Sequence, residues 1–202
     1  MLICDPDLIE RLKAERQRLG LDKRDEIWDG DYVMSPLPNV DHQWIVTELA
    51  AIFRTICRSR GNGRSFAGLN VSDRGEGWTQ NYREPDVAVY LDGNSAKDWG
   101  THWEGGPDFA VEVLSPGDPA RRKRDFYAKV NVREFMIVDR SPWSLELYRA
   151  NAGRLDLVGK ATVDGAEVLA SEVLPLTFRL IPGQERPRIE VARTDEGETW
   201  AI

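Results

Sequence analysis

Two carboxylates stand in stretches of sequence that otherwise predict apolar β-strands. Asp86 begins the strand expected at 86–91, whose alternate residues should point to opposite faces. Glu112 lies in the middle of 109–114, a nearly all-apolar run that predicts a strand buried on both faces. Burying a carboxylate is costly unless a cation or a full set of hydrogen-bond donors compensates it. The sequence therefore predicts a cation near Glu112.

The expected cation is a lysine on the helix that follows. Asp118, followed by proline, has the residue type of a helix N-cap, and the helix should run to about Val130. Lys123 shares the apolar face of this helix with Phe126 and Tyr127, three and four residues later. Two carboxylates could hold a divalent cation, and an inward ammonium beside it could stabilise negative charge on a phosphate.

Oxygen ligands are expected for any metal. The chain has two histidines and two scattered cysteines, which are too few for an ordinary zinc site or a disulfide framework. Carboxylate and carbonyl oxygens favour Mg²⁺ or Mn²⁺. If Asp86 and Glu112 lie on neighbouring strands, their repulsion also calls for a counter-cation.

The elements that must position these residues can be read from periodicity. A core helix is expected over about 41–60, and Asp29-Gly30 is typical of a hairpin turn. Further strands are expected at 64–72, 134–139, 145–149, 154–158 and 172–180.

Three further residues could support the site. His42 projects toward the apolar stripe of the core helix, and it either fixes the helix start by hydrogen bonding or supports the site from behind. Glu48, at the margin of that stripe, is a candidate third carboxylate near the metal. Tyr127 either hydrogen-bonds the site or belongs to the core.

Composition limits the remaining possibilities. The net charge of −7 argues against a protein that coats nucleic acid, although the local run 121–124 is basic. This run either meets phosphates or is a solvated face. No apolar run approaches the length of a membrane span, and the first 16 residues are too charged for a secretory signal. The chain is therefore expected to be cytoplasmic.

The chemistry-bearing residues follow a recognisable order. They are Pro85-Asp86, Glu112 to Pro116, Lys123 with Tyr127, and the strand 134–139. This order resembles the PD-(D/E)XK nuclease superfamily and, within it, a restriction endonuclease family that is greatly expanded in cyanobacteria and some other bacteria. The likeness covers roughly 25–180. The plain motif of the superfamily has a lysine two residues after the glutamate, where this chain has Leu114. The family instead places its lysine on the following helix, which is where Lys123 is expected.

The resemblance implies a Mg²⁺- or Mn²⁺-dependent endonuclease that acts on nucleic acid, with DNA the expected substrate. It implies an α/β restriction-endonuclease-like fold, a mixed central sheet flanked by helices with added antiparallel edge strands. The metal ligands would be Asp86, Glu112 and the backbone carbonyl of Val113, and Lys123 would be catalytic. A homodimer is expected, since cutting both strands of a duplex is simplest with two related sites.

The chain divides by pattern into three parts. Residues 1–24 predict a peripheral helix, 25–182 the nuclease-like domain, and 183–202 a polar extension that frays or packs on a partner.

Other classes of function remain open. A binding protein that keeps the fold without catalysis is favoured by the acidic charge; there Lys123 merely neutralises Glu112, and Asp86 caps a turn. A glycoside hydrolase would use Asp86 and Glu112 as acid and base, about 5–10 Å apart and with no lysine between them.

Overall fold

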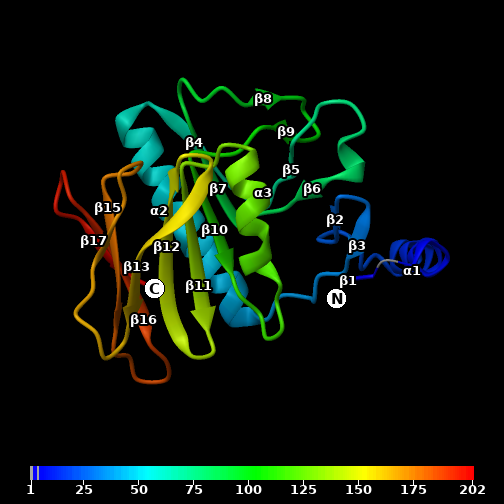
Figure 1. Cartoon of the computed structure of the whole chain (residues 1–202). Coiled ribbons are helices and arrows are strands. Elements are labelled where there is room, and N and C mark those ends of the chain that lie inside the picture. The colour runs from blue at the N-terminus through cyan, green and yellow to red at the C-terminus, as the bar shows by residue number, and fades with distance from the viewer. Residues whose placement is uncertain (1, 4) are drawn as a thin grey trace.

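A six-stranded mixed sheet lies at the centre of the computed structural model, which describes residues 2–3 and 5–202 (Figure 1). Its strand order is β13-β12-β11-β10-β7-β4. The strands are β4 (Gly63–Ala67), β7 (Val87–Leu91), β10 (Phe109–Val113), β11 (Glu134–Arg140), β12 (Trp143–Asn151) and β13 (Arg154–Thr162). β10 and β11 run parallel, and the other neighbouring strands run antiparallel.

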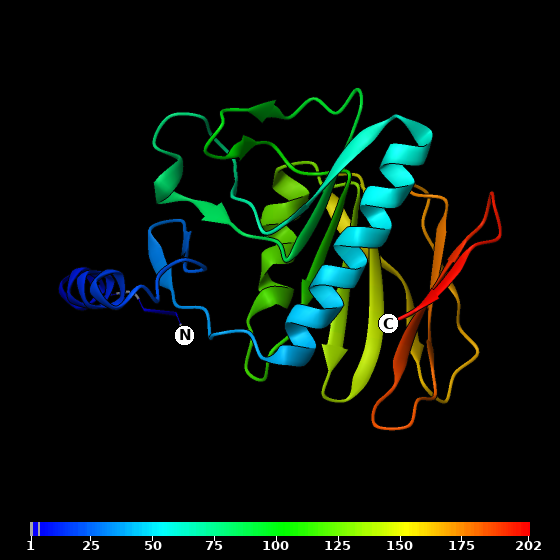
Figure 2. The same ribbon diagram turned by 180° about the vertical axis from the view of Figure 1, so that it is seen from behind.

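Helices cover both faces of this sheet. The long helix α2 (Val40–Arg60) crosses one face, and the 3₁₀ turn η2 (Ala120–Lys123) with helix α3 (Arg124–Lys129) covers the other (Figures 1 and 2). Side chains alternate accordingly, because Val111 packs in the core with α2, whereas Ala110 packs in the core with α3. The predicted α/β fold, a mixed sheet flanked by helices, is confirmed.

A second sheet of short strands lies beside the central one. Its order is β1-β3-β2-β6-β5-β9-β8. The strands are β1 (Leu2–Ile3), β2 (Glu26–Trp28), β3 (Asp31–Val33), β5 (Val71–Ser72), β6 (Tyr82–Arg83), β8 (Lys97–Asp98) and β9 (Trp103–Glu104), with a 3₁₀ turn η1 (Trp78–Gln80) before β6. Strands β2 and β3 form the expected hairpin, whose turn residues Asp29 and Gly30 both have positive φ.

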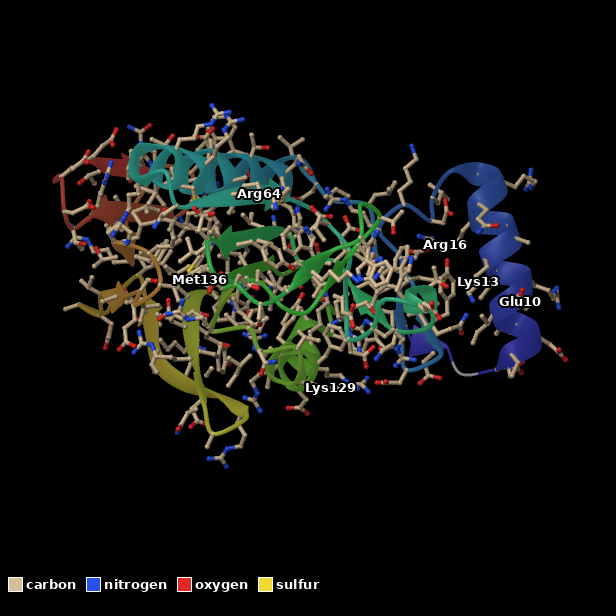
Figure 3. The ribbon with its side chains drawn as sticks, turned by 90° about the horizontal axis from the view of Figure 1, so that it is seen from above. Glu10, Lys13, Arg16, Arg64, Lys129 and Met136 are labelled. Carbon is tan, nitrogen blue, oxygen red and sulfur yellow. The ribbon has the colours of Figure 1, made fainter. Side chains whose placement is uncertain are left out.

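Helix α1 (Pro6–Leu19) packs at the outer end of this sheet. It begins at the N-cap Asp5 and ends at the left-handed Gly20. Its buried contact with the hairpin is Ile9, and Arg16 forms an ion pair with the buried Asp25. Figure 3 shows the helix standing apart from the central sheet, with Arg16 on the side that faces the protein. The predicted peripheral helix is thus present.

The C-terminal residues form a third sheet rather than a loose extension. Its antiparallel order is β14 (Leu169–Ala170), β15 (Leu176–Ile181), β16 (Arg188–Arg193) and β17 (Thr199–Ala201). Ile189, Val191 and Ile202 are buried in the same core as α2. The expectation that 183–202 frays is therefore wrong, while its packing on a partner stays an expectation. Ile189 and Val191 are buried and alternate with less buried neighbours, which is the pattern of a half-buried strand.

Two other element predictions need correction. The strand expected over 64–72 is split by Gly68, at a φ of 70°, into β4 and β5, which belong to different sheets. The helix expected over 118–130 is a 3₁₀ turn followed by six α-helical residues. Asp118 does accept a hydrogen bond from the amide of Ala120. Asn131, just after the helix, has a left-handed conformation with a φ of 65°. Among the described residues, no helix has the length and apolar character needed to cross a membrane.

Candidate active site

A cavity of about 340 Å³ lies where the β2–β3 hairpin, the start of α2 and the segment after β10 meet. The residues around it that carry charge or an imidazole are Arg16, Arg24, Glu26, His42, Glu84, Asp86, Glu112, Asp118 and Lys123. Five acidic side chains thus face three lysine or arginine side chains. The structure brings Asp86, Glu112 and Lys123, which are distant in sequence, around one hollow.

Glu112 and Lys123 form a buried ion pair inside this cavity. Glu112 lies on the face of β10 that η2 and α3 cover, and Lys123 is the last residue of η2. The Lys123 ammonium lies 2.9 Å from each carboxylate oxygen of Glu112. The hydroxyl of Tyr127, one helical turn later, donates to Oε1 of Glu112 at 2.6 Å. Lys123 therefore points inward, as the helix periodicity predicts.

Charge is unbalanced around this pair. Burial raises the pKa of Glu112; Lys123 opposes that shift, but Asp86 and Glu26 add to it. Burial alone would lower the pKa of Lys123, but the carboxylates of Glu112 and Glu26 raise it above its ordinary value. One ammonium serves more than one carboxylate, so the cavity keeps an excess of negative charge.

Asp86 is held from three sides. Its Oδ2 accepts a hydrogen bond from the amide of Val113 at 2.8 Å and lies 3.2 Å from Nε2 of His42. Its Oδ1 lies 3.4 Å from the guanidinium of Arg24, which is partly exposed. Asp86 thus ties the start of β7 to the end of β10 and does not cap a turn.

The supporting candidates have different outcomes. His42 lines the cavity, and the side chain that caps the start of α2 belongs to Asn39, which accepts from the His42 amide. The Nδ1 atom of the His42 ring is buried and has no hydrogen-bond partner among the described residues. Glu48 does not line the cavity. It stands six residues after His42, about 9 Å along the helix axis and on another face, so the helix carries it away.

Three acidic residues at the cavity, Glu26, Glu84 and Asp118, are missing from the sequence-based site candidates. Glu26, on β2, is 2% exposed, and its Oε1 lies 2.8 Å from the Lys123 ammonium. The signal was an acidic residue in a short apolar strand, the same pattern that singles out Glu112. Glu84 also lines the cavity, where burial raises its pKa to about 7 and the nearby Glu26 and Asp86 add to the shift.

The negative charge and the oxygen donors of the cavity fit a divalent cation, although the Lys123 ammonium is bound to Glu112 in this structure. Among residues 2–3 and 5–202, no group of three or more acidic, histidine or cysteine side chains is arranged to hold a metal. Both oxygens of Glu112 face Lys123, so a metal ligand at Glu112 requires that the ammonium give up one of them. The same contact disfavours a glycoside hydrolase, which needs a carboxyl group free to exchange a proton.

The proteins that this chain is similar to are described as putative nucleases. A family model described as "Uma2: Putative restriction endonuclease" matches residues 10–182. A solved structure, that of a putative nuclease belonging to DUF820 from Anabaena variabilis ATCC 29413, is 17% identical with a TM-score of 0.56. The match covers 73% of this chain and 80% of that one, and it concerns the fold. No curated protein matches the sequence.

Proposed function

The chain belongs to the Uma2 family of putative restriction endonucleases, and on this premise we propose that it is a metal-dependent endonuclease that hydrolyses phosphodiester bonds in DNA. The observation that carries the proposal is the cavity in which Asp86, Glu112 and Lys123 meet with acidic groups in excess. Such an excess is stabilised by a bound cation. The lysine supplies a second positive charge beside it.

Magnesium or manganese would be held by the carboxylates of Asp86 and Glu112, together with the backbone carbonyl of Val113. These are hard oxygen donors of the kind that both ions prefer. When bound, the ion supplies positive charge to a phosphate oxygen and acidifies a bound water. Glu84 lines the same cavity, and a cation bound there would favour its charged form.

The protein's own side chains would orient the reacting groups. Val113 and His42 hold Asp86 in place through its Oδ2. Tyr127 holds Glu112 through Oε1. The Lys123 ammonium would donate a hydrogen bond to the attacking water or to the phosphate oxygen on which negative charge grows. No nucleophilic side chain is required.

Nucleic acid would approach beside η2. Arg122 and Arg124 are exposed on either side of Lys123 in sequence and line a depression together with Lys129. Arg121 is already held by Asp139 and Glu146, so it is a weaker candidate for phosphate binding. A homodimer would place two such sites on opposite strands of a duplex. Sedimentation of the protein with and without a DNA duplex tests this arrangement.

Incubation with supercoiled plasmid and either Mg²⁺ or Mn²⁺ tests the proposal directly. The wild-type protein should nick or linearise the plasmid, and chelation should stop the reaction. Asp86→Ala, purified in the same way, should be inactive, while Asp164→Ala, at an exposed acid of the β13–β14 connection, should cut normally. Cutting that persists in Asp86→Ala would come from a contaminant and would remove the support for this site.

A second candidate function is a binding protein that retains the fold without catalysis. The specific observation in its favour is the closed ion pair, in which Lys123 contacts both oxygens of Glu112. Calorimetric titration with Mn²⁺ separates the two functions. Binding that Asp86→Ala abolishes supports the endonuclease, whereas no heat of binding at millimolar Mn²⁺ supports the non-catalytic protein.

A further inference from the structure

We propose that Glu26 is a positioning residue, which keeps the Lys123 ammonium inside the cavity when Glu112 is engaged by a divalent cation. The inference rests on the proposed function and adds a residue that comes from a different sheet. Glu26 lies on β2 of the short-stranded sheet, whereas Glu112 lies on β10 of the central sheet. Lys123 bridges the two.

The carboxylate of Glu26 is anchored on every side that the structure describes. Its Oε1 lies 2.8 Å from the Lys123 ammonium and accepts a hydrogen bond from the amide of Glu84 at 2.7 Å. Its Oε2 accepts from the indole nitrogen of Trp28 at 2.6 Å. Because three donors hold its two oxygens, the Glu26 carboxylate is fixed in position and acts as a stationary anion.

Glu112 alone cannot keep the Lys123 ammonium in the cavity once a divalent cation binds to it. Its two oxygens are both occupied by Lys123, and Oε1 also accepts from Tyr127. A cation that binds Glu112 takes over one of these oxygens and repels the ammonium. Without another anion, a buried lysine would be left unpaired, which is strongly unfavourable.

Glu26 removes this difficulty because its contact with Lys123 does not depend on Glu112. The ammonium can release one oxygen of Glu112 and remain bound to Glu26, so it stays in the cavity and faces the substrate. Lys123 is 7% exposed and Glu26 2%, so water offers little competition for this contact. The hairpin that carries Glu26 thus becomes part of the site through one hydrogen-bonded ion pair.

The main test is a double-mutant cycle on plasmid cleavage with Mn²⁺. Glu26→Gln should lower kcat about tenfold or more while KM and Mn²⁺ affinity stay within about threefold, because Glu26 touches neither substrate nor metal. Lys123→Met should lower kcat further, and the double variant should be no slower than Lys123→Met alone. Glu134→Gln, which removes the charge of a buried glutamate paired with Arg149 away from the cavity, should keep kcat.

Several outcomes would overturn the proposal. Additive losses in the double variant would mean that Glu26 acts independently of Lys123. Loss of Mn²⁺ binding in Glu26→Gln would make Glu26 a ligand, and an unchanged kcat would leave it without a role. If Glu26→Gln does not fold, Glu26→Asp retains the charge, and it should cut slowly with wild-type KM; wild-type kcat or a raised KM in that variant would contradict the proposal.

A second readout separates this inference from failure of the proposed function. The same four proteins can be unfolded by urea with and without Mn²⁺, where no cleavage is required. The coupling between residues 26 and 123 is measured as the part of the shift in the urea midpoint that is not additive in the double variant. This non-additive part should be larger when Mn²⁺ is present. If the wild type binds Mn²⁺ but cuts no DNA, a larger coupling still supports Glu26 as the anchor of Lys123. Coupling that is equal in both conditions would refute it.

Discussion

Glu112 and Glu146 occupy the same row of the central sheet, yet their surroundings differ. Glu112 pairs with Ile137 across β10 and β11, and Ile137 pairs with Glu146 across β11 and β12. The same short turn supplies a cation to each, because η2 provides Lys123 to Glu112 and Arg121 to Glu146. Each glutamate also accepts from a tyrosine hydroxyl, those of Tyr127 and Tyr148.

The difference lies in the ratio of cations to carboxylates. Glu146 receives both Arg121 and Lys160; burial would raise its pKa, but these cations and Tyr148 lower it to about 2. Glu112 shares its one lysine with Glu26, and burial raises its pKa more than that lysine lowers it. Two glutamates buried in one row therefore have opposite needs. Glu146, which contacts two cations, is satisfied by the fold even though Arg121 also pairs with Asp139, whereas Glu112, which shares one cation, can be stabilised by an external one.

The largest expected effect is on stability when each cation is removed. Lys123→Met leaves Glu26 and Glu112 buried without a cation and should lower the free energy of unfolding by about 3–5 kcal/mol at pH 8. Arg121→Met leaves Glu146 with Lys160 and Tyr148, so the loss should be about 1 kcal/mol. Urea unfolding of both variants measures the difference. Equal losses would show that the contacts of Glu112 and those of Glu146 contribute equally to stability.

The next effect is on cleavage. Glu112→Gln removes a charge from the proposed metal site and should slow plasmid cutting on the order of a hundredfold or more. Glu146→Gln changes the same residue type in the same row and should cut within about threefold of the wild type. Initial rates with saturating Mn²⁺ measure both. A slow Glu146→Gln with unchanged stability would mean that the reactive region extends along the row.

Much of this arrangement could be predicted from periodicity. Strand alternation and helix spacing fix the faces on which Glu112 and Lys123 lie, and a short β–helix–β crossover brings those faces together. The meeting of Asp86 with Glu112 needs β7 to pair with β10, a pairing that was assumed from the sequence and that periodicity does not predict. The relation between Glu112 and Lys123 is local, so the pattern of a single sequence contains it.

Contacts between distant segments could not be predicted in this way. Glu26 and Lys123 are 97 residues apart in the sequence, and nothing in the hairpin pattern indicates which part of the chain Glu26 will contact. The strand β16 is short and rich in charge, so its polar composition hides the alternation that buries Ile189 and Val191. In both cases the partner in the folded protein decides the role of the residue.

A smaller effect is expected when each tyrosine hydroxyl is removed. Tyr127→Phe takes a donor from Glu112, which has few alternatives in a fully buried position, and should cost about 1.5–3 kcal/mol. Tyr148→Phe leaves Glu146 with its two cations and should cost about 1 kcal/mol or less. Thermal unfolding at pH 7 compares them. A larger loss in Tyr148→Phe would reverse the comparison between the two glutamates.

The smallest effect concerns acid stability. The pKa of Glu146 is lowered from 4.5 to about 2 in the folded protein. Between these values the unfolded chain binds the proton and the folded chain does not, so stability falls as the pH falls through this window. The contribution is complete above pH 4.5. Because Arg121 and Lys160 are about half exposed, it should amount to about 1–2 kcal/mol.

Urea unfolding at pH 6 and pH 3 measures this contribution as the difference between wild type and Glu146→Gln. The wild type should be more stable than the variant at pH 6, and the gap should narrow at pH 3 because protonation removes the charge that the variant lacks. Titration of the other carboxylates is common to both proteins and cancels in the difference. A gap that stays constant with pH would mean that Arg121 and Lys160 stabilise Glu146 no more in the folded chain than water does in the unfolded one.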